Sequence, residues 1–251
     1  MRVATWNVNG IRARQAQFLD WVAADQPDVI CVQEVKAAPH QLAFDLAQMP
    51  GYQCYWHCAG PYSGVSLSLR TETFGDLPAC EHPAFDRETR IVLVTAGRLV
   101  IASVYVPNGG KNFDDKLAFL VELRQWAADT LEAGYDLVVC GDMNVTRSDL
   151  DVHPTERNPK VVGQRSNERE LFEELLSAGL VDLSRMLHTD EDGFFTWWAP
   201  WRNHRQRNIG WRIDYVLSSA ALAERTTDCV VQREVGTSDH APVVATFEGI
   251  G

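Results

Sequence analysis

The sequence predicts an α/β fold, a layered sandwich in which two packed, mixed β-sheets are flanked by helices. Three observations lead to this prediction. Apolar segments of strand length recur along the whole chain, helical patterns lie between them, and the strands expected at 91–95 and 99–106 are joined by the hairpin-length connection "TAGR". A single doubly wound parallel sheet needs long crossovers between successive strands, so the short connection favours two mixed sheets.

The expected strands are short apolar runs rich in β-branched residues. They cover residues 2–8, 28–33, 64–69, 91–95, 99–106, 136–141, 213–217, 228–232 and 242–247. The clearest helical patterns cover residues 12–25, 114–133 and 167–179. Gly134 ends the second helix and Gly179 the third, and either Ser166 or Asn167 is expected as the N-cap of the third.

The composition is that of a soluble globular protein, with 45% hydrophobic and 23% charged residues. No linker-like stretch, like-charge block or internal repeat divides the 251 residues, so we expect one domain over 1–251. The N-terminal "MRVATWNVNG" turns polar too early for a signal peptide, and no apolar stretch approaches the length of a membrane span. These features predict a cytoplasmic protein without a membrane partner.

The six cysteines form no CxxC pair, and several stand inside apolar runs such as "DVICVQE" and "DLVVCGD". Disulfides are rare in the cytosol. We therefore expect reduced, buried thiols rather than bridges or zinc ligands.

The formal net charge of −11 argues against binding of nucleic acid over the whole surface, because phosphate contacts need Lys and Arg. One stretch differs from the rest of this acidic chain in its charge. The segment "RNHRQRNIGWR" at 202–212 carries four arginines, one histidine and no acidic residue. It predicts a local site for a polyanion, the alternative being a solvated loop.

Polar residues of the kind that bind divalent cations or phosphate stand at the ends of five expected strands and before a sixth. They are Asn7 and Asn9, Gln33 and Glu34, Tyr105 and Asn108, Asp142 and Asn144, Asp214, and the pair Asp239 and His240. Singly, each has a structural explanation as a turn former, a helix cap or a packing residue. Strands that end at one edge bring such side chains together, and clustered carboxylates repel one another unless a cation neutralises them.

Oxygen ligands without thiolates favour Mg²⁺ or Mn²⁺ over zinc. Protein-bound Mg²⁺ usually completes its coordination with water and substrate phosphate, so the cluster predicts phosphoryl chemistry. In "GTSDHAPVV", His240 is then a donor to a phosphate oxygen, and a buried carboxylate such as Asp214 holds its tautomer and stabilises its charged form.

Seven blocks follow one another along the chain: "TWNVNGIR", "QE" at 33–34, "YSGV" at 62–65, "YVPNGG", "GDMNV", "RNIGWRIDYVL" and "TSDHAPV". With these blocks the chain resembles, from Arg2 to Phe247, the exonuclease III type of AP endonucleases within the endonuclease/exonuclease/phosphatase superfamily. The resemblance implies a four-layer α/β sandwich and Mg²⁺-dependent (or Mn²⁺-dependent) hydrolysis of phosphodiesters in double-stranded DNA with abasic sites, nicks or 3′ ends. Members cut on the 5′ side of abasic sites, and many also remove 3′ blocking groups or 3′ nucleotides.

The resemblance also implies roles for the polar cluster. The expected metal site, for one or two ions, consists of Asn7, Asn9, Glu34, Asp142, Asn144, Asp239 and His240. The expected catalytic residues are Tyr105, Asp142, Asn144, Asp214 and His240. Glu34 is the main metal carboxylate in this reading, and Asp142 orients or deprotonates the attacking water. His240, supported by Asp214, stabilises charge on the scissile phosphate, and Tyr105 lies beside that phosphate or the leaving oxygen.

The expected DNA-binding residues are Asn108, Asn158, Trp197, Arg202, Arg205, Arg207, Asn208, Trp211, Arg212 and Ile213. Trp197, Trp211 and Ile213 are expected to form the walls of a pocket for a flipped abasic sugar, the alternative being that the tryptophans are core residues. The arginines are expected to contact DNA phosphates without reading sequence.

Three departures from the family pattern bear on abasic-site affinity and on the balance of endonuclease to exonuclease activity. In the segment 161–170, Val161 stands where a phosphate-contacting Asn is common, and Gln164 and Arg165 replace a Phe-Thr pair. Asn9 stands where some members have Asp. An enzyme acting on an inositol phosphate, a sphingolipid or RNA is the first alternative, and the block at 197–215 disfavours it. A non-catalytic binding module is the second, and the presence of all the expected catalytic residues disfavours it. We expect a monomer of bacterial type whose substrate is associated with the nucleoid.

Overall fold

The computed structural model describes residues 1–75 and 79–249. Its strands are β1 (Arg2–Asn7), β2 (Val29–Gln33), β3 (Tyr52–His57), β4 (Val65–Arg70), β5 (Ile91–Ala96), β6 (Leu99–Tyr105), β7 (Asp136–Asp142), β8 (Leu180–Asp182), β9 (Asp214–Ser219), β10 (Thr226–Val231) and β11 (Val243–Phe247). Its α-helices are α1 (Ile11–Asp25), α2 (Phe44–Ala47), α3 (Thr71–Phe74), α4 (Phe113–Glu132), α5 (Ser166–Ser177), α6 (Leu183–Leu187) and α7 (Ala220–Ala223). Short 3-10 turns are η1 (Pro39–Gln41), η2 (Asp149–Asp151) and η3 (Pro154–Glu156).

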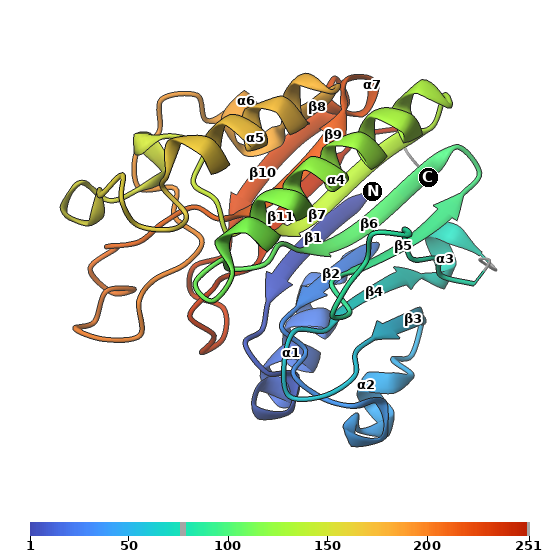
Figure 1. Cartoon of the computed structure of the whole chain (residues 1–251). Coiled ribbons are helices and arrows are strands. Elements are labelled where there is room, and N and C mark those ends of the chain that lie inside the picture. The colour runs from blue at the N-terminus through green and yellow to red at the C-terminus, as the bar shows by residue number, and fades with distance from the viewer. Residues whose placement is uncertain (76–78, 250–251) are drawn as a thin grey trace.

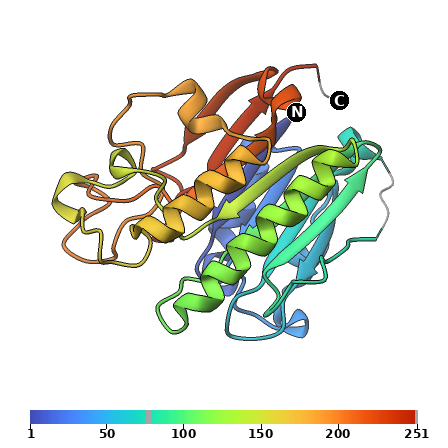
Figure 2. The ribbon, with the colours of Figure 1, turned by 45° about the horizontal axis from the view of Figure 1, so that its top comes forward.

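The strands form a six-stranded sheet with the order β10–β11–β1–β2–β4–β3 and a five-stranded sheet with the order β5–β6–β7–β9–β8. Each sheet is mixed, because β1 runs parallel to β2 and β6 runs parallel to β7 while their other neighbours are antiparallel. The sheets pack face to face, with α4 and α5 covering one outer face and α1 the other (Figure 1). Figure 2 shows α4 and α5 side by side over the five-stranded sheet. The predicted four-layer sandwich is confirmed.

The nine expected strands and three expected helices are present, with small shifts at their ends. Two strands were not predicted. The edge strand β3, "YQCYWH", contains no β-branched residue and is half-buried along its whole length, and β8 has three residues. The N-cap prediction for α5 is wrong. Arg165 occupies that position, and its backbone N–H donates to the Glu168 carboxylate.

Alternation along the strands divides the apolar core into layers. Val3 and Val138 point between the two sheets, whereas Ala4 packs toward α1 and Val139 packs toward α4 and α5. Both faces of the central strands are therefore buried, which explains why β7 reads as an almost continuous apolar run.

The inner face of the sandwich becomes polar toward one end. Thr5 Oγ1 donates to Gln33 Oε1 at 3.1 Å within the six-stranded sheet, and Gln33 Nε2 donates to Ser103 Oγ at 3.2 Å on the other sheet. Farther along the same faces, Asn7 ends β1 and Asp142 ends β7. The two-residue period thus carries the polar side chains of both sheets into the space between them.

All six cysteines are free thiols, as the sequence predicts. Four are buried, but Cys54 and Cys80 are partly exposed, so the prediction of buried thiols is wrong for those two. Within the described residues, no helix is both long enough and apolar enough to cross a bilayer.

Arg212, expected to contact DNA, is instead completely buried. Its Nε donates to Asp151 Oδ1 at 2.7 Å, and both Nη atoms donate to the Asp182 carboxylate at 2.9 Å. Arg185 joins the same cluster through Asp151 at 2.6 Å. The expectation that Arg212 binds DNA phosphate is therefore wrong, because its guanidinium is committed to the carboxylates at the start of α6 and in η2.

We predict that Arg212→Met destabilises the fold by about 3–5 kcal/mol, because the buried Asp182 carboxylate loses its bidentate partner and Asp151 loses one of its two arginines. Urea unfolding followed by tryptophan fluorescence measures the change. Arg207→Met is the matched control, since Arg207 is exposed and a surface substitution changes stability by about 0.5 kcal/mol or less. Equal unfolding midpoints for the two variants would contradict the structural role of Arg212.

Candidate active site

The predicted polar residues meet where the inner faces of the two sheets end, at the ends of β1, β6 and β7 and the start of β9. Tyr105 lies opposite Asp142 in the β6–β7 register, and Asp142 lies opposite Asp214 in the β7–β9 register. From the other sheet, Asn7 Nδ2 donates to Asp142 Oδ2 at 2.9 Å. The face-to-face packing therefore places side chains from β1, β6 and β9 around the Asp142 carboxylate of β7.

His240 is buried and aimed at the same carboxylate. Its Nδ1–H donates to Asp214 Oδ2 at 2.9 Å, and its Nε2 lies 4.0 Å from Asp142 Oδ2. Thr196 Oγ1 also donates to Asp214 Oδ2, at 2.6 Å. Asp214 thus fixes the imidazole so that Nε2 faces the centre of the site.

Glu34 lies between a phenol and an ammonium group. Tyr105 Oη donates to Glu34 Oε1 at 2.7 Å, and Lys36 forms an ion pair with Glu34 Oε2. Lys36 Nζ also donates to Asn9 Oδ1 at 2.7 Å. Lys36 was not predicted from the sequence, although its place two residues after Glu34 was the available signal.

A second series of hydrogen bonds holds Asn9 and Asp239, two further residues of the expected metal site. Asn9 Nδ2 donates to Asp239 Oδ1 at 2.8 Å, and its backbone N–H donates to Asn7 Oδ1 at 2.9 Å. Trp197 Nε1 donates to the other Asp239 oxygen at 3.0 Å. The loop that carries Asp239 and His240 is fastened to β1 as well, because Ser238 Oγ donates to the Asn7 carbonyl at 2.7 Å.

Asn144 organises the other side of Asp142. Its backbone N–H donates to Asp142 Oδ1 at 2.9 Å, its Nδ2 donates to the Val106 carbonyl at 2.8 Å, and its Oδ1 accepts from Asn108 at 3.2 Å. Asn9, Glu34 and Asn144 all have positive φ, between 45° and 52°. Such backbone conformations cost energy for non-glycine residues and concentrate at functional sites.

A buried ion pair supports Asn144 from beneath. Lys116 on α4 is fully buried, pairs with Glu168 on α5 and donates to the Asn144 carbonyl at 2.7 Å. Glu168 Oε1 accepts from Gly163 N at 2.5 Å, and Gly163 lies against the Trp211 ring. Lys116 was not predicted, because nothing local distinguishes it from a surface lysine.

The charges in the site are strongly coupled. Burial raises the pKa of Asp142, Asp214 raises it further and His240 opposes them, which gives a pKa of about 7. Burial lowers the pKa of His240, but the Asp214 and Asp142 carboxylates outweigh it and raise the pKa to about 10. Burial also raises the pKa of Glu34, but Lys36 and His240 outweigh it and keep this pKa below its ordinary value.

The donor set fits a hard divalent cation. One ligand atom each of Asp142, Asp214 and His240 lies within 4.8 Å of the others, and among the described residues no donor pairs with the buried Asp214 Oδ1. Glu34 and Asn9 already direct oxygens at one cation, the Lys36 ammonium. Carboxylate and amide oxygens are the ligands of Mg²⁺ and Mn²⁺.

The two tryptophans expected to line a pocket lie beside this centre. Trp197 and Trp211 are half-buried, with ring centroids 5.3 Å apart in an edge-on arrangement, and Trp197 lies 6.5 Å from the His240 ring. Ile213, the third expected wall residue, is mostly buried, with 6% of its surface exposed. The tryptophans are therefore neither fully in the core nor remote from the catalytic cluster.

The other expected DNA contacts differ in accessibility. Asn108, Asn158, Arg202 and Arg207 are exposed. Arg205 donates to the backbone carbonyls of Arg233, Val235 and Ser238, and Asn208 accepts from Trp198 and donates to Gly193. Arg205 and Asn208 therefore hold loops together in the free protein.

Three exposed side chains, Trp201, Tyr62 and Lys111, were not predicted. Trp201 is 59% exposed next to Arg202, and Tyr62 is 76% exposed beneath the Lys111 ammonium, which lies 5.6 Å from its ring centre. The sequence signal was present in "APWRN" and "PYSGV", but exposure is decided by packing.

We predict that the His240 imidazole titrates near pH 10 in the metal-free protein, and that Asp214→Asn lowers this pKa by more than one unit. Nitrogen-15 NMR of the histidine rings measures both values. Because the folded-state pKa is raised, the charged ring stabilises the fold fully below pH 6.5, and this contribution is lost as the pH rises toward 10. A His240 titration near pH 6.5 in wild type would contradict the prediction.

Comparison with known proteins agrees with this geometry. The chain matches the model of the Endonuclease/Exonuclease/phosphatase family over residues 4–240. It is 33% identical to the exodeoxyribonuclease of Bacillus subtilis over 250 residues, which cover 97% of this chain and 98% of that protein. It is 32% identical to Recombination repair protein 1 of Drosophila melanogaster, of which it spans 37% of the length.

Two solved structures share nearly the whole fold. A 3′ phosphatase from Neisseria bound to a product DNA hairpin superposes with a TM-score of 0.90 at 30% identity, covering 99% of both chains. An AP endonuclease from Archaeoglobus fulgidus superposes with a TM-score of 0.89 at 27% identity, also covering 99% of both chains. The chain therefore belongs to the Endonuclease/Exonuclease/phosphatase family, and within it this protein is a hydrolytic DNA-repair nuclease of the exodeoxyribonuclease III and AP endonuclease type.

Proposed function

We propose that this nuclease hydrolyses phosphodiesters of double-stranded DNA in a Mg²⁺- or Mn²⁺-dependent reaction, cutting on the 5′ side of abasic sites and trimming or cleaning 3′ ends. The observation that carries the proposal is the convergence of Glu34, Asp142, Asp214 and His240 at one edge of the sandwich, beside two half-buried tryptophans. The names of the related proteins, an exodeoxyribonuclease, a 3′ phosphatase and an AP endonuclease, support the same range of substrates.

We propose Glu34 as the main ligand of the cation, with Asn7, Asn9 and Asp239 nearby. Asp142, Asn144 and His240 line the opposite side of the same cluster. The bound ion supplies Lewis-acid polarisation of the phosphate oxygens and offsets the repulsion between the carboxylates. The number of Mg²⁺ or Mn²⁺ ions bound at this cluster, measured by metal titration, distinguishes a one-ion from a two-ion site.

The protein groups then divide the work of hydrolysis. Asp142, with a pKa of about 7, is poised to take a proton from the attacking water. Asn7 and the Asn144 backbone each hold one Asp142 oxygen, so the carboxylate is fixed before the substrate arrives. As water attacks phosphorus and the bond to the leaving oxygen breaks, the charged His240 donates its Nε2–H to a phosphate oxygen.

Tyr105 remains a proton donor throughout. Burial raises its pKa well above the ordinary value, and the Glu34 and Asp142 carboxylates raise it further. In the free protein its hydroxyl donates to Glu34. We propose that it orients Glu34 and lies beside the phosphate or the leaving oxygen.

Trp197 and Trp211 are proposed as the walls that receive an abasic sugar. Their edge-on pair lies beside His240, and Trp211 is supported by Gly163, where an added Cβ would lie 2.9 Å from the ring. A flipped sugar without a base fits a small apolar site that excludes a complete nucleotide.

We also propose that residues 1–251 act as one domain and as a monomer in the cytoplasm. Every residue of the proposed site comes from one chain, so catalysis does not require a second copy. Light scattering of the active protein tests the monomer.

Asp142→Asn and His240→Ala are expected to reduce nicking of an abasic duplex by about 10²-fold or more, because they remove the base and the charge-stabilising donor. Single-turnover cleavage of an end-labelled duplex with a central abasic analogue measures the rate, and a duplex with a 3′-phosphate measures end cleaning. EDTA should stop both reactions, and added Mg²⁺ or Mn²⁺ should restore them.

Asp129→Asn and His40→Ala are matched controls, because both residues are exposed and lie outside the site. Thermal unfolding confirms that each variant is folded. Cleavage within tenfold of wild type by Asp142→Asn would refute its role, and cleavage that persists in EDTA would refute the metal dependence. Activity on the 3′-phosphate alone would assign end cleaning and exclude abasic cleavage.

Replacement of Arg202 and Arg207 together by Ala is expected to weaken DNA binding and to make the slope of log affinity against log salt shallower by about two, or about one per lost phosphate contact. The rate at saturating DNA should stay near that of wild type. Fluorescence anisotropy over a salt series measures the slope. Arg98→Ala is the control, because Arg98 precedes β6 at the end opposite Tyr105, and an equal slope for both proteins would contradict the proposed contacts.

A further inference from the structure

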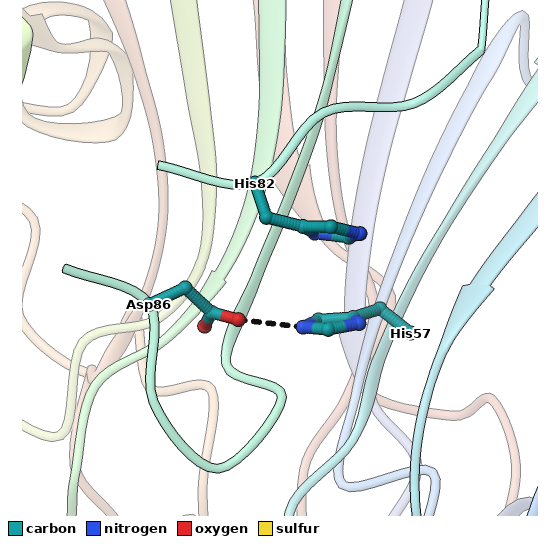
Figure 3. Close-up of side chains that lie close together, drawn as sticks. All are labelled: His57, His82 and Asp86. Carbon is teal, nitrogen blue, oxygen red and sulfur yellow. Dashed lines mark hydrogen bonds and ion pairs between the residues drawn. The ribbon is translucent and has the colours of Figure 1, made fainter. Parts of the chain in front are cut away.

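A second cluster of metal-binding residue types lies outside the catalytic centre. It consists of His57 at the end of β3 and of His82 and Asp86 in the segment before β5 (Figure 3). One nitrogen of each imidazole and one carboxylate oxygen all lie within 4.8 Å of one another. The proposed hydrolysis uses none of these three residues.

The backbone around the cluster orients its donors. Asp86 Oδ1 accepts from the backbone N–H of Arg90 at 2.9 Å and of Ile91 at 3.0 Å, and its other oxygen accepts from His57 Nε2 at 2.6 Å. His82 Nδ1 lies 2.9 Å from the Ile91 carbonyl. A carbonyl oxygen only accepts, so Nδ1 carries the proton and the neutral ring keeps its lone pair on Nε2. Hydrogen bonds like those that Asp86 Oδ1 accepts hold ligating carboxylates in place in known sites.

The cluster is open to solvent on the His82 side. His82 is exposed, whereas His57 and Asp86 have 21% and 10% of their side chains exposed. The two imidazole rings stack with centroids 3.8 Å apart and planes inclined by 23°. An ion binds in the plane of an imidazole, so chelation by both rings requires the exposed His82 ring to leave the stack and its hydrogen bond to the Ile91 carbonyl. The ion also has to replace the proton between His57 Nε2 and the Asp86 carboxylate.

The local charge favours a cation. Burial raises the pKa of Asp86, but His57 and the two backbone donors outweigh it and hold this pKa below its ordinary value, so Asp86 is a carboxylate at neutral pH. The neighbouring arginines are already paired, Arg87 with Asp115 and Glu122 and Arg90 with Glu88.

We propose that His57, His82 and Asp86 form a second metal site, which binds a borderline divalent transition-metal ion of the Zn²⁺ type and leaves a position for water. Two imidazole nitrogens and one carboxylate oxygen are a ligand set that zinc accepts readily. The oxygen-rich catalytic centre has the opposite preference, for Mg²⁺ or Mn²⁺. The two sites are thus distinguished by ligand chemistry.

An ion in this position links the two sheets. The outer strands β3 and β5 contact each other, and the cluster joins the end of one to the segment that enters the other. The same segment carries Arg90, whose guanidinium lies 4.8 Å from the centre of the Tyr105 ring. The ion therefore stabilises the open edge of the sandwich and the backbone behind Tyr105.

Titration of the metal-stripped full chain with Zn²⁺ against a chromophoric chelator tests the proposal. Wild type and His40→Ala should bind one equivalent of Zn²⁺ at this site. His57→Ala and His82→Ala should bind that Zn²⁺ about tenfold more weakly or not at all. Glu34→Gln should keep this equivalent, because it alters only the catalytic centre. Zn²⁺ should also raise the melting temperature of wild type but not that of His82→Ala.

His82 is exposed, so His82→Ala is expected to stay folded, and its metal-free melting temperature checks this. Nitrogen-15 NMR of the histidine rings identifies the ligands directly, because Zn²⁺ should shift the signals of His57 and His82 and leave that of His40 unchanged. Equal Zn²⁺ binding by His40→Ala, His57→Ala and His82→Ala, or unshifted His57 and His82 signals, would overturn the second site while leaving the proposed nuclease function untouched.

Discussion

The site depends on one geometric constraint, which is that two sheets pack face to face and their strands end at the same place. Side chains alternate along each strand, so a polar residue two positions beyond a core residue continues on the same face. Asn7 follows Thr5 in this way, and Asp142 follows Cys140. The hydrogen bond between Asn7 and Asp142 joins the sheets where their apolar core ends.

This arrangement concentrates buried negative charge, and the contacts of these carboxylates with His240 and Lys36 partly neutralise it. Against the effect of burial, the Asp214 and Asp142 carboxylates raise the pKa of His240, while Lys36 and then the His240 imidazolium lower the pKa of Glu34. The ammonium of Lys36 bridges Glu34 and Asn9. A site whose dipoles are already oriented before substrate binds stabilises developing charge without further reorganisation.

Several basic residues of this acidic protein hold its internal structure together. Arg212 joins η2 to the start of α6, Arg205 holds the loop before His240, and Lys116 holds the backbone of Asn144. Of the four arginines in the basic segment at 202–212, Arg202 and Arg207 are the exposed ones. On a chain of net charge −11, such a local basic surface is the basis of our proposal that DNA binds at one face.

The sequence by itself determined the layered fold, the long helices, the central strands and the oxygen-rich ligand set, because strand and helix periodicity and ligand chemistry are local properties of the chain. Tertiary structure decided which charged side chains reach solvent. Arg212 and Arg207 belong to the same basic segment, yet one is buried between two carboxylates and the other is exposed. The cluster of His57, His82 and Asp86 also exists only in the folded chain, since β3 was not recognised from its residues and its contact with the segment before β5 comes from sheet packing. Burial and long-range pairing depend on how distant segments pack, and no local pattern specifies them.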